Sequence, residues 1–219
     1  MSEDIISQLE DAIRQRFITW TQNIRFALPV FVTNENQHYT PHAFDISVPS
    51  TLIRPDSVSV DKLDERVFNR LQQIEMAHFI NHFRSLELEL TSESNQANLY
   101  DTLEQAFTSV NEIERPDTIL IPRNRLSALN DYIRNLRIGQ SVILRDNLNH
   151  VVYEGESNEF YIYSRENITK IFPKDKNQRL ILNIDHDEGF VNPSRFWGHI
   201  QQELMIRNIE NIARITVNN

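Results

Sequence analysis

The sequence predicts an α+β protein, and two features of its apolar pattern predict that class. Four segments before residue 137 carry apolar residues at steps of three and four, the spacing of an amphipathic helix. From residue 141 onward, short apolar and aromatic runs recur at regular intervals between polar turns, which is typical of strands. With 219 residues, 40% hydrophobic and 24% charged, the chain can bury a core as one domain or two small ones.

The first quarter of the chain predicts a helix followed by a β-hairpin. One apolar stripe indicates a helix over about residues 5–24. Residues 26–58 then become β-rich on both sides of a polar turn at residues 34–37, which predicts a long hairpin. The four prolines of this segment suit a projecting arm better than a central sheet, and an isolated hairpin is stable only when it packs on a neighbour.

The middle of the chain predicts a long helix and then an α/β layer. Helical spacing continues over residues 63–88, and about 25 residues make a helix of about 37 Å. A polar stretch at residues 91–96 is interpreted as a break. A helix over residues 99–110, a buried strand over residues 118–121 and a helix over residues 126–136 follow in close succession.

The last third of the chain predicts mainly strands. The polar residues 146–149 indicate a turn between the first two of them. A final apolar segment extends over residues 200–215. The expected strands are residues 141–144, 151–153, 160–163, 168–172 and 180–184.

Charge is distributed unevenly along the chain, whose net charge is −9. Residues 1–114 carry 8 basic and 18 acidic side chains, residues 115–145 carry 6 and 2, and residues 146–219 carry 8 and 11. An acidic protein of this kind is not expected to bind duplex DNA in a sequence-specific manner. The change of sign is compatible with a solvated basic helix face, and it also allows attraction between copies of the chain.

Composition and motifs indicate that the protein is not an enzyme and has no cofactor. The chain contains no cysteine and 4 glycines, none of them in a phosphate-binding or nucleophile-elbow motif. No run of eighteen apolar residues occurs, so we expect no membrane partner, and the N-terminus lacks the pattern of a cleaved leader.

Three clusters offer alternative functions of another class. Glu75, His78 and His82 share one face of the long helix, but a carboxylate metal site needs a second such helix, so a structural helix is the favoured interpretation. His186 lies among three carboxylates without the spacing of a calcium loop. Aromatic residues could stack on single-stranded nucleic acid, although the surrounding charge is acidic; they are Phe160, Tyr161, Tyr163, Phe196 and Trp197.

The order of elements resembles the fold shared by major capsid proteins of tailed phages and by encapsulin shells. The most specific likeness is Arg115 to Leu129, in which Pro116-Asp117 precedes an apolar strand, Pro122 ends it and a helix follows. The passage from Ile46 into the long helix at Leu63 resembles the return of an extended loop into the spine helix of that family. The segment from Glu203 to Val217 resembles its closing strand.

The resemblance implies a capsid-like α+β fold with five parts. They would be an N-terminal helix or arm, an extended β-hairpin loop, a peripheral domain with the spine helix, an axial α/β domain, and a return to the peripheral domain. In this sequence the parts correspond to residues 1–25, 26–58, 59–95, 96–189 and 190–219.

The resemblance also implies a structural subunit that assembles into an icosahedral shell, either a phage capsid or an encapsulin-type nanocompartment. Its partners would be many copies of itself, with packaged nucleic acid or cargo held without sequence specificity. The location would be the virion, assembled in the host cytoplasm, or the cytoplasm for a compartment. No lysine precedes Lys62, so the loop cannot supply the amine of an isopeptide cross-link between subunits. The expected contacts between subunits are Phe31, Tyr39, Phe44, Arg123, Arg125 and Arg134.

Overall fold

The computed structural model describes seven stretches of the chain, which form two compact units. The stretches are residues 3–22, 30–33, 40–47, 60–135, 148–154, 157–186 and 193–218. The first unit comprises residues 1–25, 30–78 and 170–204, and the second comprises residues 26–29, 79–169 and 205–219. Each unit is therefore assembled from segments that are far apart in the sequence. No helix among the described stretches is long and apolar enough to cross a membrane.

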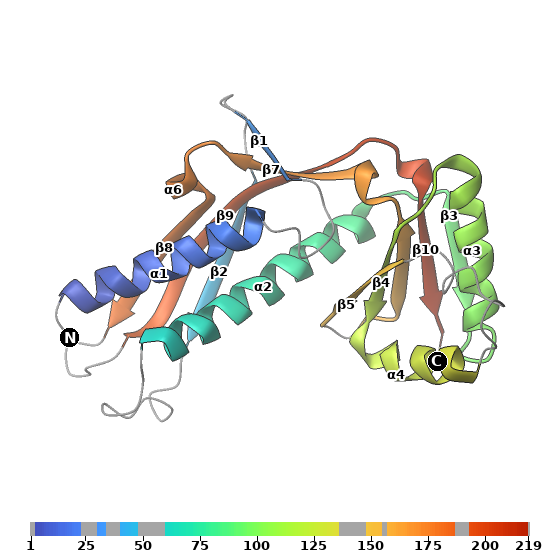
Figure 1. Cartoon of the computed structure of the whole chain (residues 1–219), viewed down its shortest axis with the longest axis horizontal. Helices are drawn as coiled ribbons and strands as arrows, with labels where there is room; N and C mark the ends of the chain where they lie inside the picture. The colour runs from blue at the N-terminus through green and yellow to red at the C-terminus, as the bar shows by residue number, and fades with distance from the viewer. Residues whose placement is uncertain are drawn as a thin grey trace. The chain divides into compact units, whose positions relative to one another are not determined.

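The first unit is built on a mixed sheet and two long helices (Figure 1). The strands follow the order β1-β7-β9-β2, and β8 also pairs with β9. The strands are β1 (Val30–Thr33), β2 (Thr40–Ser47), β7 (Ile168–Pro173), β8 (Leu180–His186) and β9 (Pro193–Ile206). The helices are α1 (Glu3–Gln22), α2 (Val60–Ser85, which continues into the second unit) and the short α6 (Lys176–Arg179).

The core of the first unit lies between these helices and the sheet. Helix α1 packs on β8, and the ring of Phe17 meets that of Phe172 edge-on with centroids 6.5 Å apart. Burial alternates along β2 and β9, so Phe44 and Phe196 face the core while Asp45 and Trp197 are exposed. This alternation is what a sheet buried on one face requires.

The predicted β-hairpin is wrong for the strands that the structure describes. Strand β1 pairs in parallel with β7, and β2 pairs antiparallel with β9, so β1 and β2 are not neighbours in the sheet. With β2 paired to β9, Phe44 and Ile46 are buried in the core of the unit, whereas a projecting hairpin would leave them exposed. The turn expected at residues 34–37 lies outside the described stretches.

The second unit contains a five-stranded sheet with a helix near each edge. The strand order is β3-β10-β6-β4-β5; β6 runs antiparallel to its neighbours β10 and β4, while the two outer pairs are parallel. Helix α3 packs on β10, β3 and β6, and α4 packs on β4 and β5. The strands are β3 (Leu90–Ser94), β4 (Thr118–Pro122), β5 (Asn149–Tyr153), β6 (Glu159–Tyr163) and β10 (Ile212–Val217). The helices are α3 (Leu99–Ile113), α4 (Arg123–Asn135) and the single turns η2 (Arg165–Asn167) and η3 (Ile209–Asn211).

Most elements predicted from the sequence are confirmed in the described stretches. The helices predicted over residues 5–24, 63–88, 99–110 and 126–136 correspond to α1, α2, α3 and α4. The predicted buried strand is β4, all five of whose residues are buried. The polar break predicted at residues 91–96 is wrong in part, because Leu90–Ser94 forms the edge strand β3. The strand predicted over residues 141–144 lies outside the described stretches.

Candidate functional site

Glu75, the acidic residue of the predicted metal pattern, is fully buried against a lysine of the same unit. Its Oε1 contacts Nζ of Lys170, which β7 brings to this side of α2. Burial lowers the pKa of Lys170, because the charged amine loses its hydration. Glu75 Oε2 has no hydrogen-bond partner among the described atoms. The Glu75 carboxylate of α2 therefore forms a buried ion pair with Lys170 of β7.

The two histidines of the pattern are half-buried at separate points along α2. The ring of His78 packs on that of His42 in β2, with centroids 4.3 Å apart. Burial lowers the pKa of both His78 and His82. Within the described stretches, no group of three or more histidine, aspartate or glutamate side chains is arranged to hold a metal ion. Glu75, His78 and His82 are thus not brought together as a ligand set.

The aromatic row that suggested nucleic-acid binding is part of the core of the second unit. Phe160, Tyr161 and Tyr163 are fully buried, so they cannot stack on bases, and the interpretation as a stacking platform is wrong for them. Trp197 is 41% exposed, and its Nε1 donates to Asp185 Oδ2 at 3.0 Å. The carboxylates around His186 lie partly outside the described stretches.

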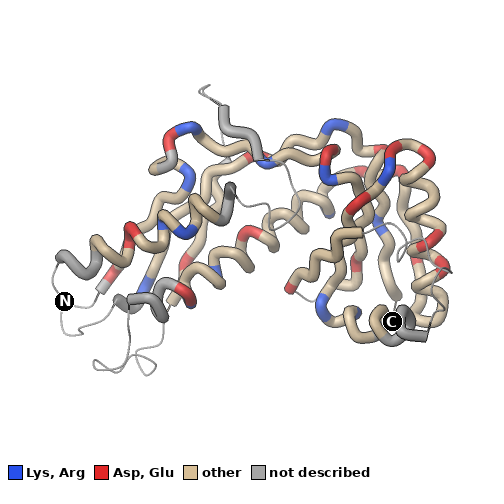
Figure 2. The backbone as a smooth tube through the Cα atoms, viewed as in Figure 1, with Lys and Arg blue, Asp and Glu red and all other residues tan. Residues whose placement is uncertain are grey.

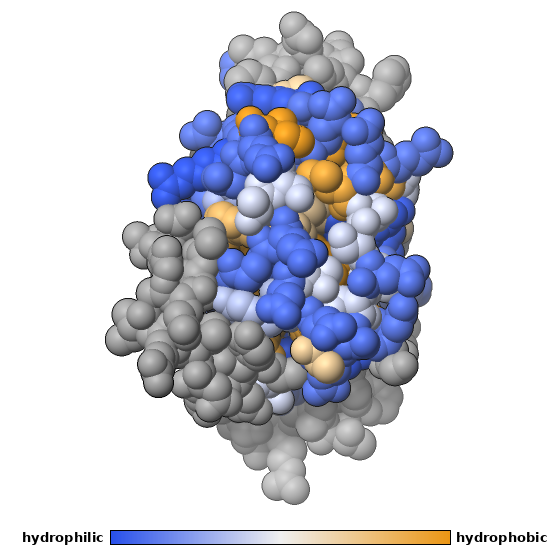
Figure 3. Space-filling model, turned by 90° about the vertical axis from the view of Figure 1, so that its right-hand side faces the viewer, coloured by the Kyte–Doolittle hydropathy of each residue, from blue (hydrophilic) through white to orange (hydrophobic). Residues whose placement is uncertain are grey.

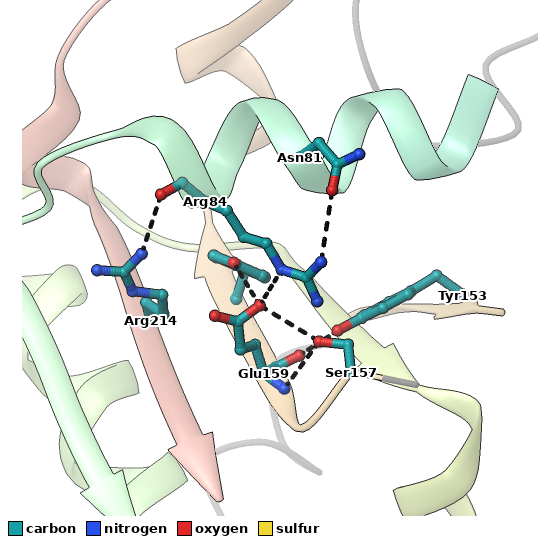
Figure 4. Close-up of polar contacts among 7 residues, drawn as sticks. Asn81, Arg84, Tyr153, Ser157, Glu159 and Arg214 are labelled. Carbon is teal, nitrogen blue, oxygen red and sulfur yellow. Dashed lines mark hydrogen bonds and ion pairs between the residues drawn. The ribbon is translucent and has the colours of Figure 1, made fainter. Parts of the chain in front are cut away.

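Glu159 is the centre of a polar cluster in the second unit that sequence reasoning did not find (Figure 4). Its Oε2 lies 2.5 Å from Nε of Arg84, near the end of α2. The same oxygen accepts from Tyr161 OH at 3.2 Å and from Ser157 Oγ at 3.3 Å. Tyr153 OH donates to the backbone carbonyl of Glu159 at 2.5 Å. The cluster therefore joins the end of α2 to β5 and β6.

The chemistry of this cluster is that of a structural clamp. Burial raises the pKa of Tyr153 to about 12, and it also raises the pKa of Tyr161, so both phenols stay neutral donors near neutral pH. The hydrogen bond to Glu159 raises the pKa of Arg84, which stays charged. Spacing could not reveal the cluster, because Arg84 and Glu159 are 75 residues apart in the sequence.

The residues predicted to contact other subunits lie in different environments. Phe44 is buried in the core of its own chain, which leaves little surface for a neighbour and argues against its predicted role. Phe31 pairs in register with Ile171, and Tyr39 lies outside the described stretches. Arg123, Arg125 and Arg134 all belong to α4.

Two arginines of α4, Arg123 and Arg125, contact neighbouring polar groups. The side chain of Arg123 is 63% exposed, and its Nε lies 2.5 Å from Glu154 Oε1. Arg125 is half-buried and donates through Nε and Nη2 to Asn158 Oδ1 at 3.2 and 3.1 Å. Both residues belong to the basic segment of residues 115–145. Figure 2 marks the lysine and arginine positions along the backbone in blue.

On the exposed face of the sheet in the first unit, charged side chains of three neighbouring strands contact one another. Arg195 of β9 donates to both carboxylate oxygens of Asp45 in β2, with Nη2 2.7 Å from Oδ2. Its Nη1 lies 3.7 Å from Asp185 of β8. Hydrogen bonding from Arg195 lowers the pKa of Asp45. These contacts are on the solvent side of the sheet, where each exposed ion pair contributes little to stability.

Three solved structures share the fold of this chain. The virus-like particle from Pyrococcus furiosus matches with a TM-score of 0.64 and 15% identity, over 97% of this chain and 98% of that chain. The procapsid of satellite phage P4, which includes the size-determination protein, matches with a TM-score of 0.54 and 7% identity, over 100% of this chain and 93% of that chain. The holo-SrpI encapsulin complex from Synechococcus elongatus PCC 7942 matches with a TM-score of 0.52 and 9% identity, over 84% of this chain and 76% of that chain.

No protein-family model matches the chain, and no curated protein matches its sequence. At identities of 7–15%, the three structural matches establish the fold alone. The chain has a capsid fold, as the order of its elements predicts.

Proposed function

We propose that the chain is a structural subunit of which many copies assemble into a closed icosahedral shell. The observation that carries this proposal is the match to the Pyrococcus furiosus virus-like particle, which covers 97% of this chain and 98% of that chain. A match over nearly the full length of both chains leaves no sizeable insertion in which a different activity would reside. Assembly, and not catalysis, is therefore the function that the fold supports best.

The particle is either a phage capsid or an encapsulin-type compartment. The similar structures include both a phage procapsid and an encapsulin complex, so both forms are compatible with the fold. In the first form the protein resides in the virion after assembly in the host cytoplasm, and in the second it stays in the cytoplasm. A phage capsid would enclose nucleic acid, and a compartment would enclose a cargo protein.

The shell is proposed to be held together without covalent links. No lysine precedes Lys62, so residues 26–58 cannot donate an amine to a cross-link. Contacts would instead come from apolar side chains in this segment, including Phe31 and Tyr39, and from charge attraction that involves α4.

Electron microscopy of the purified protein tests assembly directly. We expect closed particles of uniform size by negative stain, and a matching mass by light scattering. Because charge attraction contributes, the assembled fraction should change between low salt and about 1 M salt, where the Debye length falls to about 3 Å. A stable monomer or dimer at every salt and protein concentration would contradict the proposal.

Denaturing electrophoresis tests the absence of covalent links. Particles should dissociate into a single band of the 25.8 kDa chain. A ladder of higher bands in fully denatured particles would show that a cross-link forms through some other lysine, and it would overturn the non-covalent part of the proposal only.

A further inference from the structure

The first unit brings together two histidines from elements that are well separated in the sequence. His42 lies in β2 and His78 lies in α2, and both residues belong to this unit. The centroids of their rings are 4.3 Å apart, and the ring planes are inclined by 34°. Helical spacing within α2 gives no sign of this contact, because the second ring comes from a strand.

The two rings lie at the rim of the core between α2 and the sheet. Alternation along β2 places His42 on the same face as Phe44 and Ile46, and those two side chains are buried. His42 and His78 are each half-buried. The core therefore holds the pair in place, while part of each ring stays open to solvent and to dissolved ions.

The separation of the rings suits two imidazoles that bind one ion. A divalent transition metal binds an imidazole nitrogen at about 2.0–2.1 Å, which places each ring centre about 3.2 Å from the ion. Two rings at a right angle around the ion then have centres about 4.5 Å apart. The observed 4.3 Å is close to that value. The outer torsion of histidine has a broad minimum, so each ring can turn one nitrogen toward a shared point at little cost.

The kind of donor selects the class of ion. Imidazole nitrogens suit transition metals, whereas Mg²⁺ and Ca²⁺ prefer oxygen ligands. An arrangement near a right angle is typical of Ni²⁺ and Cu²⁺, and it fits the tetrahedral geometry of structural zinc less well. Burial lowers the pKa of His78, so its ring is neutral at pH 7, as a ligand must be.

The pair differs from the helical metal pattern that the sequence contains. Glu75, one turn before His78, is already paired with Lys170 in the core. Within the described stretches no third histidine or carboxylate side chain joins the two rings as a ligand group. Water would therefore complete the coordination of an ion, which is typical of a site that binds and releases its metal.

The described surface around α3, in the second unit, has a different character. It is mainly hydrophilic, with a small hydrophobic group near one end (Figure 3). Ile113 of α3 is 49% exposed and Ile209 of η3 is 41% exposed. Single exposed apolar side chains of this kind are ordinary on protein surfaces and indicate no ligand. The histidine pair, in contrast, combines a fixed geometry with a donor chemistry.

We propose that His42 and His78 together bind one Ni²⁺ or Cu²⁺ ion through one ring nitrogen each. The ion would connect β2 to α2. Among the described strands β2 pairs with β9 alone, so this connection would add a second attachment for the strand. Both ligands belong to one chain, and the site is therefore independent of the proposed assembly.

Calorimetric titration with Ni²⁺ tests the site. The protein is produced without a histidine tag, stripped of metal with a chelator and then freed of the chelator. We expect the original protein to bind one Ni²⁺ per chain at the pair. His42→Gln and His78→Gln should each weaken this binding at least about tenfold, because each variant removes one of two protein ligands. An excess of Mg²⁺ should not compete.

Two other histidines provide matched controls. His82 lies one turn after His78 on α2, where it would be the second ligand if the ion were bound by the helix alone. His199 is half-buried in β9, on the same face as the exposed Trp197. His82→Gln and His199→Gln should both bind Ni²⁺ within about twofold of the original protein. Circular dichroism of each variant verifies that the helices and strands still form.

The unfolding midpoint provides a second measurement. An ion that binds the folded pair stabilises the folded chain, so Ni²⁺ should raise the midpoint of the original protein and of His82→Gln but not that of His42→Gln. Three outcomes would overturn the inference: a protein that does not bind Ni²⁺, a His42→Gln variant that binds it as well as the original protein, or binding that is lost in His82→Gln and retained in His42→Gln. The last outcome would place the ion on α2 alone.

Discussion

Lys170 and Glu75 form a buried ion pair whose two members depend on one another. A buried charge without its partner costs about 3–5 kcal/mol, whereas an apolar replacement of both members is often neutral. We therefore expect Glu75→Leu and Lys170→Met each to lower the free energy of unfolding by about 3–5 kcal/mol. The double variant should regain most of that loss. Urea denaturation followed by circular dichroism measures all three.

An exposed lysine of the same region is the matched control for this pair. Lys174 is exposed just after β7, so Lys174→Met should change the free energy of unfolding by less than about 0.5 kcal/mol. If the loss of stability in the double variant equalled the sum of the two single losses, the two side chains would not be energetically coupled, which would contradict this prediction.

The half-buried His78 is expected to lower the free energy of unfolding in mild acid. Burial lowers its pKa below the usual value of about 6.5. At pH values between the folded and the unfolded pKa, the unfolded state binds a proton at this histidine and the folded state does not. The contribution of neutral His78 is therefore complete above about pH 6.5 and is lost as the pH falls through its lower folded pKa.

The measurement is the unfolding midpoint between pH 7 and pH 5. His78→Gln should reduce the drop in the unfolding midpoint across this range but not abolish it, because burial also lowers the pKa of His82. Asn69→Gln, at an exposed position of the same helix, should leave the drop unchanged. An unaltered drop in His78→Gln would show that this histidine does not titrate with folding.

Single residues show what sequence spacing can and cannot predict. The steps of three and four correctly place Glu75, His78 and His82 on α2. The partner that defines the role of Glu75 is Lys170, 95 residues away, and its position depends on the packing of β7. Local spacing therefore identifies a face of a helix, whereas the chemistry of that face depends on a contact that only the folded chain creates.

At the scale of elements, local pattern predicts the type of an element better than its partners. The alternation in β2 correctly predicts a strand, but the long-range pairing with β9 replaces the expected hairpin. Strand β3 was missed because its sequence, LTSES, is polar. Strand β3 lies at the edge of the sheet, where polar side chains are common. Its position is fixed by the parallel backbone pairing to β10 and not by an apolar pattern of its own.

Gly198 in β9 predicts a close approach of two backbones. Its φ is +156°, and a Cβ at this position would lie 1.8 Å from the carbonyl oxygen of Ile181 in β8. The neighbouring atom is backbone and cannot rotate away, so Gly198→Ala must separate the two strands. We expect it to lower the free energy of unfolding by about 3 kcal/mol, measured by urea denaturation.

An alanine on the exposed side of the neighbouring strand is the control for this position. Ser47 is exposed in β2 and is in register with Arg195, so Ser47→Ala changes no buried contact and should stay within about 0.5 kcal/mol of the original protein. A Gly198→Ala variant as stable as Ser47→Ala would mean that β8 and β9 adjust without cost.

At the scale of the whole molecule, the order of elements predicts the fold although identity to the similar structures is only 7–15%. That order survives because each unit needs its strands and helices in fixed places, while many apolar residues can fill a given core position. The extent of each unit could not be predicted. The chain contributes three separate segments to each of them, and only the folded contacts show which segments belong together.

This interleaving makes the C-terminal strand essential to a unit whose other strands come much earlier. Strand β10 lies between β3 and β6, and its apolar side chains Ile212, Ala213, Ile215 and Val217 are all buried. Removing residues 209–219 would take away the burial of three large side chains at about 2 kcal/mol each, together with hydrogen bonding to both neighbouring strands. A loss of about 6 kcal/mol or more is comparable to the whole stability of a typical domain.

We therefore expect the chain that ends at residue 208 to lose the fold of its second unit and to form no particles, even though every residue of α3, α4 and β4 is still present. Near-ultraviolet circular dichroism is the readout, because Tyr161 and Tyr163 are fully buried in that unit and should lose their fixed environment. Thr216→Ala, which keeps the strand and alters only a half-exposed side chain, should retain both the signal and assembly. A truncated chain with an intact tyrosine signal would contradict the prediction, because the remaining strands would then have formed the sheet without the strand that lies between β3 and β6.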